Sequence, residues 1–208
     1  MAGFWDRHVV PKIVGCCCSQ ERITEQRRKV VPQASGRVLE LGAGGGANLP
    51  LYDRSRVDAV IGIDPSDELR ARAEAAMRPG DRGIFEIRAG RAEELPFADA
   101  WFDTVVSTFT LCSVGDQARA LAEARRVLKP GGRFLFLEHG RAPDLGPYAW
   151  QRRIEPVWKR LMGNCHLTRP VTEAVAGAGL AVRAHDGCYM EKTPKFMAWI
   201  EWGEAGLG

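Results

Sequence analysis

The sequence has no long hydrophobic run. A helix that crosses a membrane needs about 20 consecutive, mostly apolar residues, and charged residues or glycine interrupt every apolar stretch of this 208-residue chain well before that length. We therefore expect a soluble, cytoplasmic protein without a membrane span, for which only peripheral membrane contact stays open. With 45% hydrophobic residues, the chain is long enough for a sizeable core in a single domain, 1–208.

An excess of charge of one sign is also lacking. The 29 basic and 26 acidic residues give a formal net charge of +3, and the two signs are interspersed along the chain. Proteins that bind nucleic acid usually gather lysine and arginine into a basic arm or stripe. The charge pattern therefore predicts no nucleic-acid partner.

The six cysteines show no disulfide framework. Cys16, Cys17 and Cys18 are contiguous, and the others are scattered, at Cys112, Cys165 and Cys188. Disulfide scaffolds space their cysteines along short secreted chains, and zinc motifs separate theirs by two or more residues. Neither spacing is present, so we expect a reducing compartment and no bound metal. The contiguous run could bind a soft metal or be oxidised, or consist of ordinary helix residues.

Apolar runs alternate with helical patterns through the middle of the chain. Buried strands are expected at 37–41, 59–63, 83–89, 103–108 and 133–138, with helices at 66–77 and 116–128. Asp116 is a candidate N-cap for the second helix. Strands that alternate with helices predict an α/β fold, a parallel sheet covered on both faces.

The two ends of the chain differ from this middle part. Residues 1–35 mix apolar and charged positions and predict a helical cover. After the core at 36–140, residues 141–208 predict an amphipathic helix at 148–162, a helix at 170–178, and strands at 180–185 and 195–202.

A glycine-rich turn follows the first predicted strand, with Gly42, Gly44 and Gly46 at alternate positions. Glycine lets the backbone approach a ligand closely and adopt positive φ. Asp64 ends the next strand, at about the 20-residue offset where a carboxylate accepts hydrogen bonds from ribose hydroxyls. A nicotinamide site would place the third glycine one residue later, and Glu40 suits a cationic amino-acid ligand better than a pyrophosphate. A tight turn with an incidental acid is the structural alternative.

Five segments in order resemble the motif series of class I S-adenosylmethionine-dependent methyltransferases. They are ELGAGGG at 40–46, GIDPS at 62–66, EELPF at 93–97, FDTVVS at 102–107 and RVLKPGG at 126–132. The resemblance implies a Rossmann-like three-layer sandwich, a seven-stranded, mostly parallel sheet with a C-terminal antiparallel hairpin.

The same resemblance implies a set of cofactor-binding residues. It puts the loop Gly42–Gly46 against the methionine portion of S-adenosylmethionine, Asp64 on the ribose, and the Gly90–Ala92 loop beside the adenine. Many relatives have an aspartate where this chain has Arg91, so backbone groups of Arg91 and Ala92 are expected to contact the adenine. The implied set is Glu40, Gly42, Ala43, Gly44, Gly46, Asn48, Asp64, Pro65, Gly90, Arg91, Ala92 and Thr108.

The segments that choose the methyl acceptor resemble a narrower group. TLCSV at 110–114, FLEHG at 136–140 and WQRRIEPVWKRLMGNCHLTR at 150–169 are similar to small alkyl-thiol methyltransferases related to membrane-anchored vertebrate enzymes, whose N-terminal anchor we do not find here. The resemblance implies a small thiol acceptor. An N- or C-methyltransferase acting on a lipid head group or quinone precursor, and a cofactor-binding module without catalysis, are the alternatives.

Methyl transfer to sulfur requires a thiolate, which nearby positive charge or a base would favour. His139, His166 and Arg169 are candidates for that role, and Cys112 is a candidate to face the cofactor's sulfonium. Each could instead be a structural polar or core residue. Candidates to cover an apolar pocket, or to be ordinary core, are Phe4, Trp5, Tyr148, Trp150, Trp158 and Met162.

Overall fold

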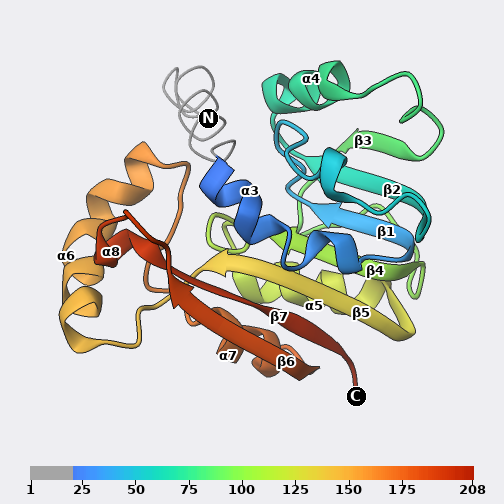
Figure 1. Ribbon diagram of the computed structural model, residues 1–208. Helices are drawn as coiled ribbons and strands as arrows, with labels where there is room; N and C mark the ends of the chain where they lie inside the picture. Colours follow the sequence, from blue (N-terminus) through green and yellow to red (C-terminus); the bar gives the residue numbers. More distant parts are fainter. Residues whose placement is uncertain (1–20) are drawn as a thin grey trace.

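The computed structural model describes residues 21–208 and is organised around one seven-stranded sheet (Figure 1). The strands lie in the spatial order β3-β2-β1-β4-β5-β7-β6. Their bounds are β1 Gly36–Leu41, β2 Val57–Asp64, β3 Phe85–Ala89, β4 Phe102–Thr108, β5 Leu128–His139, β6 Leu180–Tyr189 and β7 Trp199–Leu207. Strand β7 is antiparallel to β5 and β6, and the other pairs are parallel. The predicted sheet and its C-terminal antiparallel hairpin are confirmed.

The helices connect and cover these strands. Their bounds are α3 Glu21–Arg27, α4 Asp67–Ala76, α5 Gln117–Val127, α6 Leu145–Leu161, α7 Val171–Gly177 and α8 Lys195–Ala198, with short 3-10 turns η1 Val31–Gln33 and η2 Leu49–Leu51. Asp116 caps α5 as predicted, because its side chain accepts the Arg119 N–H at 3.0 Å. Ser66 caps α4 in the same way, accepting the Leu69 N–H at 3.3 Å.

Alternating side chains along the strands divide the core into two layers. Phe134 and Phe136 of β5 pack with α5 and α7, while Leu135 and Leu137 face the opposite side of the sheet, where η1 and α8 contribute. Figure 1 shows α5 and α7 on one face of the sheet and α3 on the other. The described residues therefore form the three layers expected of a Rossmann-like fold.

Several predicted boundaries differ from the structure, and two of these differences have a clear local cause. The strand predicted at 195–202 begins only at Trp199, because Lys195–Ala198 forms α8 directly after Pro194. Proline is favoured at a helix start, where no intrahelical N–H bond is lost. Strand β5 begins at Leu128 rather than 133, with Gly131 at φ +77° absorbing the sharp turn that follows α5.

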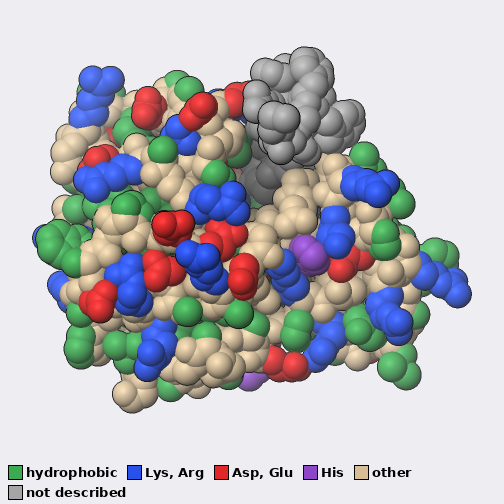
Figure 2. Space-filling view, turned by 180° about the vertical axis from the view of Figure 1, so that it is seen from behind, with side chains coloured by type: hydrophobic (Ala, Val, Ile, Leu, Met, Phe, Trp, Pro, Cys, Tyr) green, Lys and Arg blue, Asp and Glu red, His purple; other side chains and the backbone are tan. Residues whose placement is uncertain are grey.

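Several sequence predictions lie outside the described residues. These are the first part of the N-terminal cover, with Phe4, Trp5 and Cys16–Cys18. Within residues 21–208, no helix has both the length and the apolar character needed to cross a bilayer. On the face shown in Figure 2, basic and acidic side chains alternate without a large patch of either sign.

Candidate cofactor and acceptor site

A cavity of about 530 Å³ opens at the carboxyl ends of β1, β2 and β4. In parallel α/β sheets, ligands bind at this edge. The lining comes from five segments, residues 42–47 except Gly46, 63–66, 90–93, 108–115 except Leu111 and Cys112, and 162–164, together with Arg27 and Leu69. Residues distant in the sequence therefore share one cavity because their strands end side by side.

The glycine loop forms the floor of the cavity. Gly42, Gly44 and Gly46 have φ of +64°, +55° and +80°, a left-handed conformation that side chains disfavour. A Cβ on Gly42 would collide with the Thr110 side chain, and one on Gly46 would lie 2.7 Å from Leu49 Cδ1. A Cβ on Gly44 would meet nothing closer than the Gly42 carbonyl at 3.9 Å. The space beside Gly44 is thus open to a ligand.

Asp64 stands at the end of β2 with its carboxylate fixed by two backbone groups. The Gly44 N–H donates to Oδ2 at 3.0 Å, and the Ser66 N–H donates to Oδ1 at 2.8 Å. The side chain is buried and lines the cavity, and burial raises the pKa of this carboxyl above its usual value. Each oxygen can still accept a second hydrogen bond, so the carboxylate is positioned to bind ligand hydroxyls.

Glu40 lies behind the loop and does not line the cavity. Its oxygens accept hydrogen bonds from Asn48 Nδ2 and the Tyr52 hydroxyl, both at 2.8 Å. Complete burial raises the pKa of Glu40 to about 7. The expectation that Glu40 and Asn48 line the ligand space therefore needs correction, because the two side chains pair with each other beneath the loop; Gly46 also lies off the lining.

Nine of the predicted cofactor residues line the cavity: Gly42, Ala43, Gly44, Asp64, Pro65, Gly90, Arg91, Ala92 and Thr108. Arg91 forms an ion pair with Glu93 at 3.2 Å. Glu93 in turn accepts the Gly115 N–H at 2.9 Å. Where many relatives have an aspartate, this chain therefore has an arginine that is paired with Glu93 and lines the cavity.

Arg27, at the end of α3, was missed by sequence reasoning. Its guanidinium is buried, donates from Nη1 to Asn48 Oδ1 at 2.9 Å and to Thr108 Oγ1, and lies 5.1 Å from the centre of the Phe109 ring. In the described part of the chain no carboxylate forms an ion pair with Arg27, and Nε has no hydrogen-bond partner. The sequence held only a weak indication that Arg27 is buried, namely that it shares a helix face with the apolar Ile23, four residues earlier.

The loop after β4, residues 109–115, forms the wall of the cavity opposite the glycine loop; we call it the acceptor wall. Glu138, fully buried on β5, accepts hydrogen bonds from Ser107 Oγ at 2.7 Å, Thr110 N–H at 3.0 Å and Cys112 N–H at 3.2 Å. Arg169 donates to the Leu111 carbonyl and, at 2.8 Å, to the Val114 carbonyl. This predicted cation thus holds the loop from outside and does not line the cavity.

The three predicted catalytic residues lie behind this wall. Cys112 is buried, His139 packs edge-on against Phe109 with ring centres 5.1 Å apart, and His166 Nδ1 lies 3.4 Å from Glu155 Oε1. None of the three lines the cavity, whereas Phe109 does. Burial lowers the pKa of His166. The structure places all three next to the wall and out of direct contact with the ligand space.

The predicted apolar cover is only partly present. Met162 lines the cavity, but Tyr148, Trp150 and Trp158 do not. Trp150 is 56% exposed on α6, where it lines a separate groove with Phe196 of α8. Phe109 and Val114 supply the apolar wall instead, at positions that no helical pattern marks.

Residues 39–136 match the methyltransferase domain family. The chain is 32% identical over 202 residues to human thiol S-methyltransferase TMT1B, covering 91% of this chain and 80% of that protein. It is also 45% identical over 115 residues to phosphatidylethanolamine N-methyltransferase of Cereibacter sphaeroides, 55% of each chain.

The fold agrees with solved structures. A Haloferax volcanii methyltransferase in complex with the activator Trm112 superposes with a TM-score of 0.72 at 21% identity, over 98% of this chain and 96% of that one. Geranyl diphosphate methyltransferase in complex with S-adenosylmethionine gives 0.69 at 14% identity, over 89% and 84%. With its motif series, sheet order and glycine-loop cavity, the chain belongs to the class I S-adenosylmethionine-dependent methyltransferases.

Proposed function

We propose that this enzyme transfers the methyl group of S-adenosylmethionine to the sulfur of a small, apolar thiol. The observation that carries the proposal is the character of the acceptor wall. Phe109, Val114 and Met162 give this side of the cavity an apolar surface, and the other side chains on that side, Thr110, Ser113 and Asn164, are uncharged.

The described carboxylates of the lining are Asp64, beside the glycine loop, and Glu93. Among residues 21–208, Glu93 is already paired with Arg91 and the Gly115 N–H, and Asp64 with two backbone N–H groups, so neither carboxylate is free to act as a general base. A thiol suits such a wall, because with a pKa near 8.5 a few per cent is already ionised at neutral pH.

The cofactor fits the residues present. The open space beside Gly44 accepts a ligand where a side chain would intrude, and Asp64 offers a fixed carboxylate to ribose hydroxyls. We propose that Arg27 binds the cofactor's carboxylate, since a buried guanidinium that forms no ion pair with a carboxylate of residues 21–208 favours an anion. When bound, S-adenosylmethionine supplies a methyl group activated by a positively charged sulfur.

The chain's own contribution is then alignment and exclusion of water. Glu138 and Arg169 fix the loop that carries Phe109 and Val114, so the acceptor wall is held in place before any ligand arrives. Preorganised alignment of reactants can supply several kcal/mol of the barrier. We propose that Cys112 and His166, which lie behind this wall, help to position the loop and do not contact the acceptor.

A lipid head group is the second candidate acceptor. The relatedness to a phosphatidylethanolamine N-methyltransferase is joined by exposed apolar side chains on α6, where Leu145, Trp150, Val157 and Leu161 are 44–86% exposed. Basic residues of the same helix flank them, a combination typical of helices that lie on a membrane surface. Such contact would bring the cavity close to head groups.

Turnover with labelled S-adenosylmethionine separates the candidates. The enzyme is assayed with small thiols that differ in pKa, with phosphatidylethanolamine vesicles and with a quinol. We expect methylated thioether from the thiols, with the rate rising with pH as the thiolate fraction grows. Turnover of phosphatidylethanolamine or quinol with none on any thiol would refute the thiol assignment and leave the methyltransferase assignment standing.

A further inference from the structure

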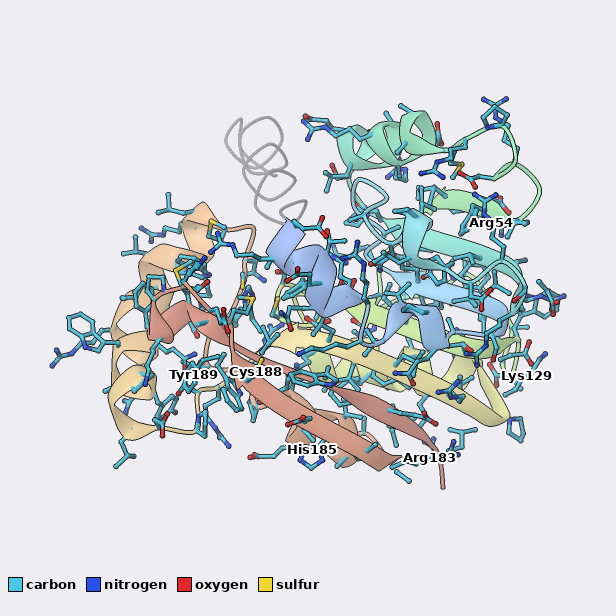
Figure 3. All side chains as sticks on the ribbon, in the orientation of Figure 1. Arg54, Lys129, Arg183, His185, Cys188 and Tyr189 are labelled. Atoms are coloured by element: carbon cyan, nitrogen blue, oxygen red, sulfur yellow. The ribbon has the colours of Figure 1, made fainter. Side chains whose placement is uncertain are left out.

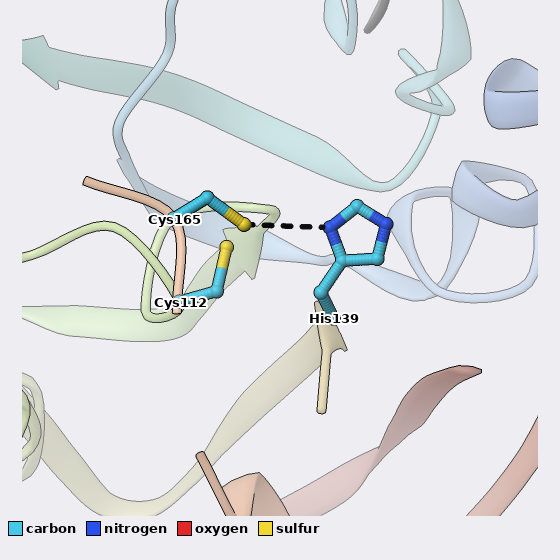
Figure 4. Close-up of side chains that lie close together, drawn as sticks. All are labelled: Cys112, His139 and Cys165. Carbon is cyan, nitrogen blue, oxygen red and sulfur yellow. Dashed lines mark hydrogen bonds between the residues drawn. The ribbon is translucent and has the colours of Figure 1, made fainter. Parts of the chain in front are cut away.

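Two cysteines and a histidine from three separate segments meet behind the acceptor wall (Figure 4). Cys112 follows β4, His139 ends β5, and Cys165 follows α6. The two Sγ atoms and a ring nitrogen of His139 all lie within 4.8 Å of one another, and Cys165 Sγ is 3.8 Å from His139 Nδ1. Both cysteines are free thiols, and both are buried.

We propose that Cys112, His139 and Cys165 form a binding site for a zinc ion. Two thiolates and an imidazole are the ligand types that zinc prefers. Around a tetrahedral zinc ion with the usual bond lengths, a sulfur and a nitrogen ligand lie about 3.6 Å apart and two sulfurs about 3.8 Å apart. The distance of 3.8 Å between Cys165 Sγ and His139 Nδ1 is close to that value. All three ligand atoms lie within 4.8 Å of one another, so an approach of about 1 Å or less brings them to these separations.

Hydrogen bonds hold the two cysteine segments together. The His166 N–H donates to the Cys112 carbonyl at 2.7 Å, and Asn164 Nδ2 donates to the Ser113 carbonyl at 2.9 Å. The first of these bonds joins main-chain atoms, so it places Cys165 beside Cys112 whatever the side chains do. Asn164 takes a left-handed φ of +64°, a conformation that asparagine adopts more readily than most residues with a side chain. The turn that presents Cys165 is therefore held in a specific conformation without a ligand.

The surroundings of the cluster suit a metal ion with two thiolates. Glu138 accepts the Cys112 N–H at 3.2 Å, and Arg169 donates to the Val114 carbonyl at 2.8 Å on the same loop. The two negative charges of the thiolates balance the charge of a divalent ion. The charges of the nearby Glu138 carboxylate and Arg169 guanidinium also balance each other. Hydrogen-bonded groups around the ligands are usual at zinc sites, and here Glu138 and Arg169 bond the main chain of the loop that carries Cys112.

The cluster lies directly behind the acceptor wall. Ser113 and Asn164, each next in sequence to one of the cysteines, line the cavity, and so does Phe109, which packs against His139. A bound ion would join the loop after β4, the end of β5 and the turn after α6 at one point. The site therefore goes beyond the proposed thiol methylation, because it would brace the wall whichever acceptor the enzyme uses.

Metal content and cobalt substitution test the site on the whole chain. We expect the protein, supplied with zinc and then dialysed, to retain about one ion per chain. Replacement by cobalt(II) should give thiolate-to-cobalt charge-transfer absorption in the near ultraviolet and the visible bands of a tetrahedral ion. C112S and C165S should each lose most of this absorption, with folding monitored by circular dichroism.

Two control variants separate this cluster from the chain's other thiols. C188S changes a partly buried cysteine on β6, which Figure 3 labels, and should keep the cobalt spectrum. C16S/C17S/C18S removes the contiguous cysteines and should also keep it. Loss of the spectrum in this triple variant, no charge-transfer absorption in the unmodified protein, or a Cys112–Cys165 disulfide in protein purified with reductant would each overturn the proposal.

Discussion

The backbone N–H of Gly44 donates a 3.0 Å hydrogen bond to Asp64 Oδ2 and so joins the glycine loop to the end of β2. The loop and the carboxylate are the two parts of the cofactor site that the sequence shows most clearly, and this bond makes them one structural unit. A change at either residue is therefore expected to affect cofactor binding through both.

Replacing Asp64 with alanine should weaken binding of S-adenosylhomocysteine by about 1.5–3 kcal/mol, the usual value of a charge-assisted hydrogen bond. Isothermal titration calorimetry measures this directly. Asp58→Ala, an exposed change on the same strand, is the matched control and should bind normally. Unchanged affinity in a folded Asp64→Ala protein would show that the ribose assignment is wrong.

Gly44→Ala should abolish cofactor binding at a small cost in stability. The new Cβ meets no protein atom within 3.4 Å, so the cost to folding is the left-handed backbone, about 1 kcal/mol. Gly131→Ala provides the control, because Gly131 also has positive φ, at +77°, and nothing lies within 4 Å of its Cβ position. Both variants should lower the melting temperature alike, and only Gly44→Ala should lose the cofactor. Normal binding by Gly44→Ala would rule out a ligand beside the loop.

Arg27→Met tests the proposed carboxylate contact. We expect this variant to bind S-adenosylmethionine about tenfold or more weaker, whereas its affinity for the decarboxylated analogue should match that of the unmodified protein. Arg28→Met, which alters an exposed arginine paired with Glu21, controls for the loss of charge. Equal losses for both ligands would mean that Arg27 acts only through Asn48 and Thr108.

Glu40 should make stability depend on pH. Its pKa is about 7 in the folded protein and near 4.5 when exposed, so the folded state holds a proton that the unfolded state releases between these values. Stability should therefore fall as pH rises from 4.5 to 7 and level off above 7. In Glu40→Gln this contribution disappears, and thermal melts of both proteins from mildly acidic to mildly alkaline pH measure the difference. Parallel melting curves across this range would contradict burial of a titrating carboxyl.

The fold and the glycine loop could be predicted because local rules govern them. Strand periodicity, an N-cap at Asp116 and positive φ at Gly44 each depend on a few neighbouring residues. Sequence position alone does not tell whether the Glu40 side chain faces the cavity; in the structure it lies beneath the loop, bonded to Asn48 and Tyr52. The contact between Arg27 and Thr108 spans 81 residues, a pairing that only the folded chain reveals.

The same dependence on long-range contacts explains why the sequence did not show the cysteine and histidine cluster behind the acceptor wall. Cys112, His139 and Cys165 looked like scattered residues, since their spacing matches no metal motif. They meet because β4 and β5 are parallel neighbours whose ends carry the first two, and the turn after α6 brings the third. A cluster assembled from strand ends has no linear signature, so the sequence prediction of no metal rested only on the contiguous cysteines.

Gln151, buried on α6, accepts the Ala142 N–H at 2.9 Å and donates to the Gly140 carbonyl at 3.1 Å. The helix is thereby anchored to the end of β5. Trp150 and Val157 of the same helix are exposed and do not line the cavity, so changes there are expected to leave the cavity intact. Enzymes with this arrangement can therefore vary the exposed side chains of this helix while the methyl-transfer reaction stays the same.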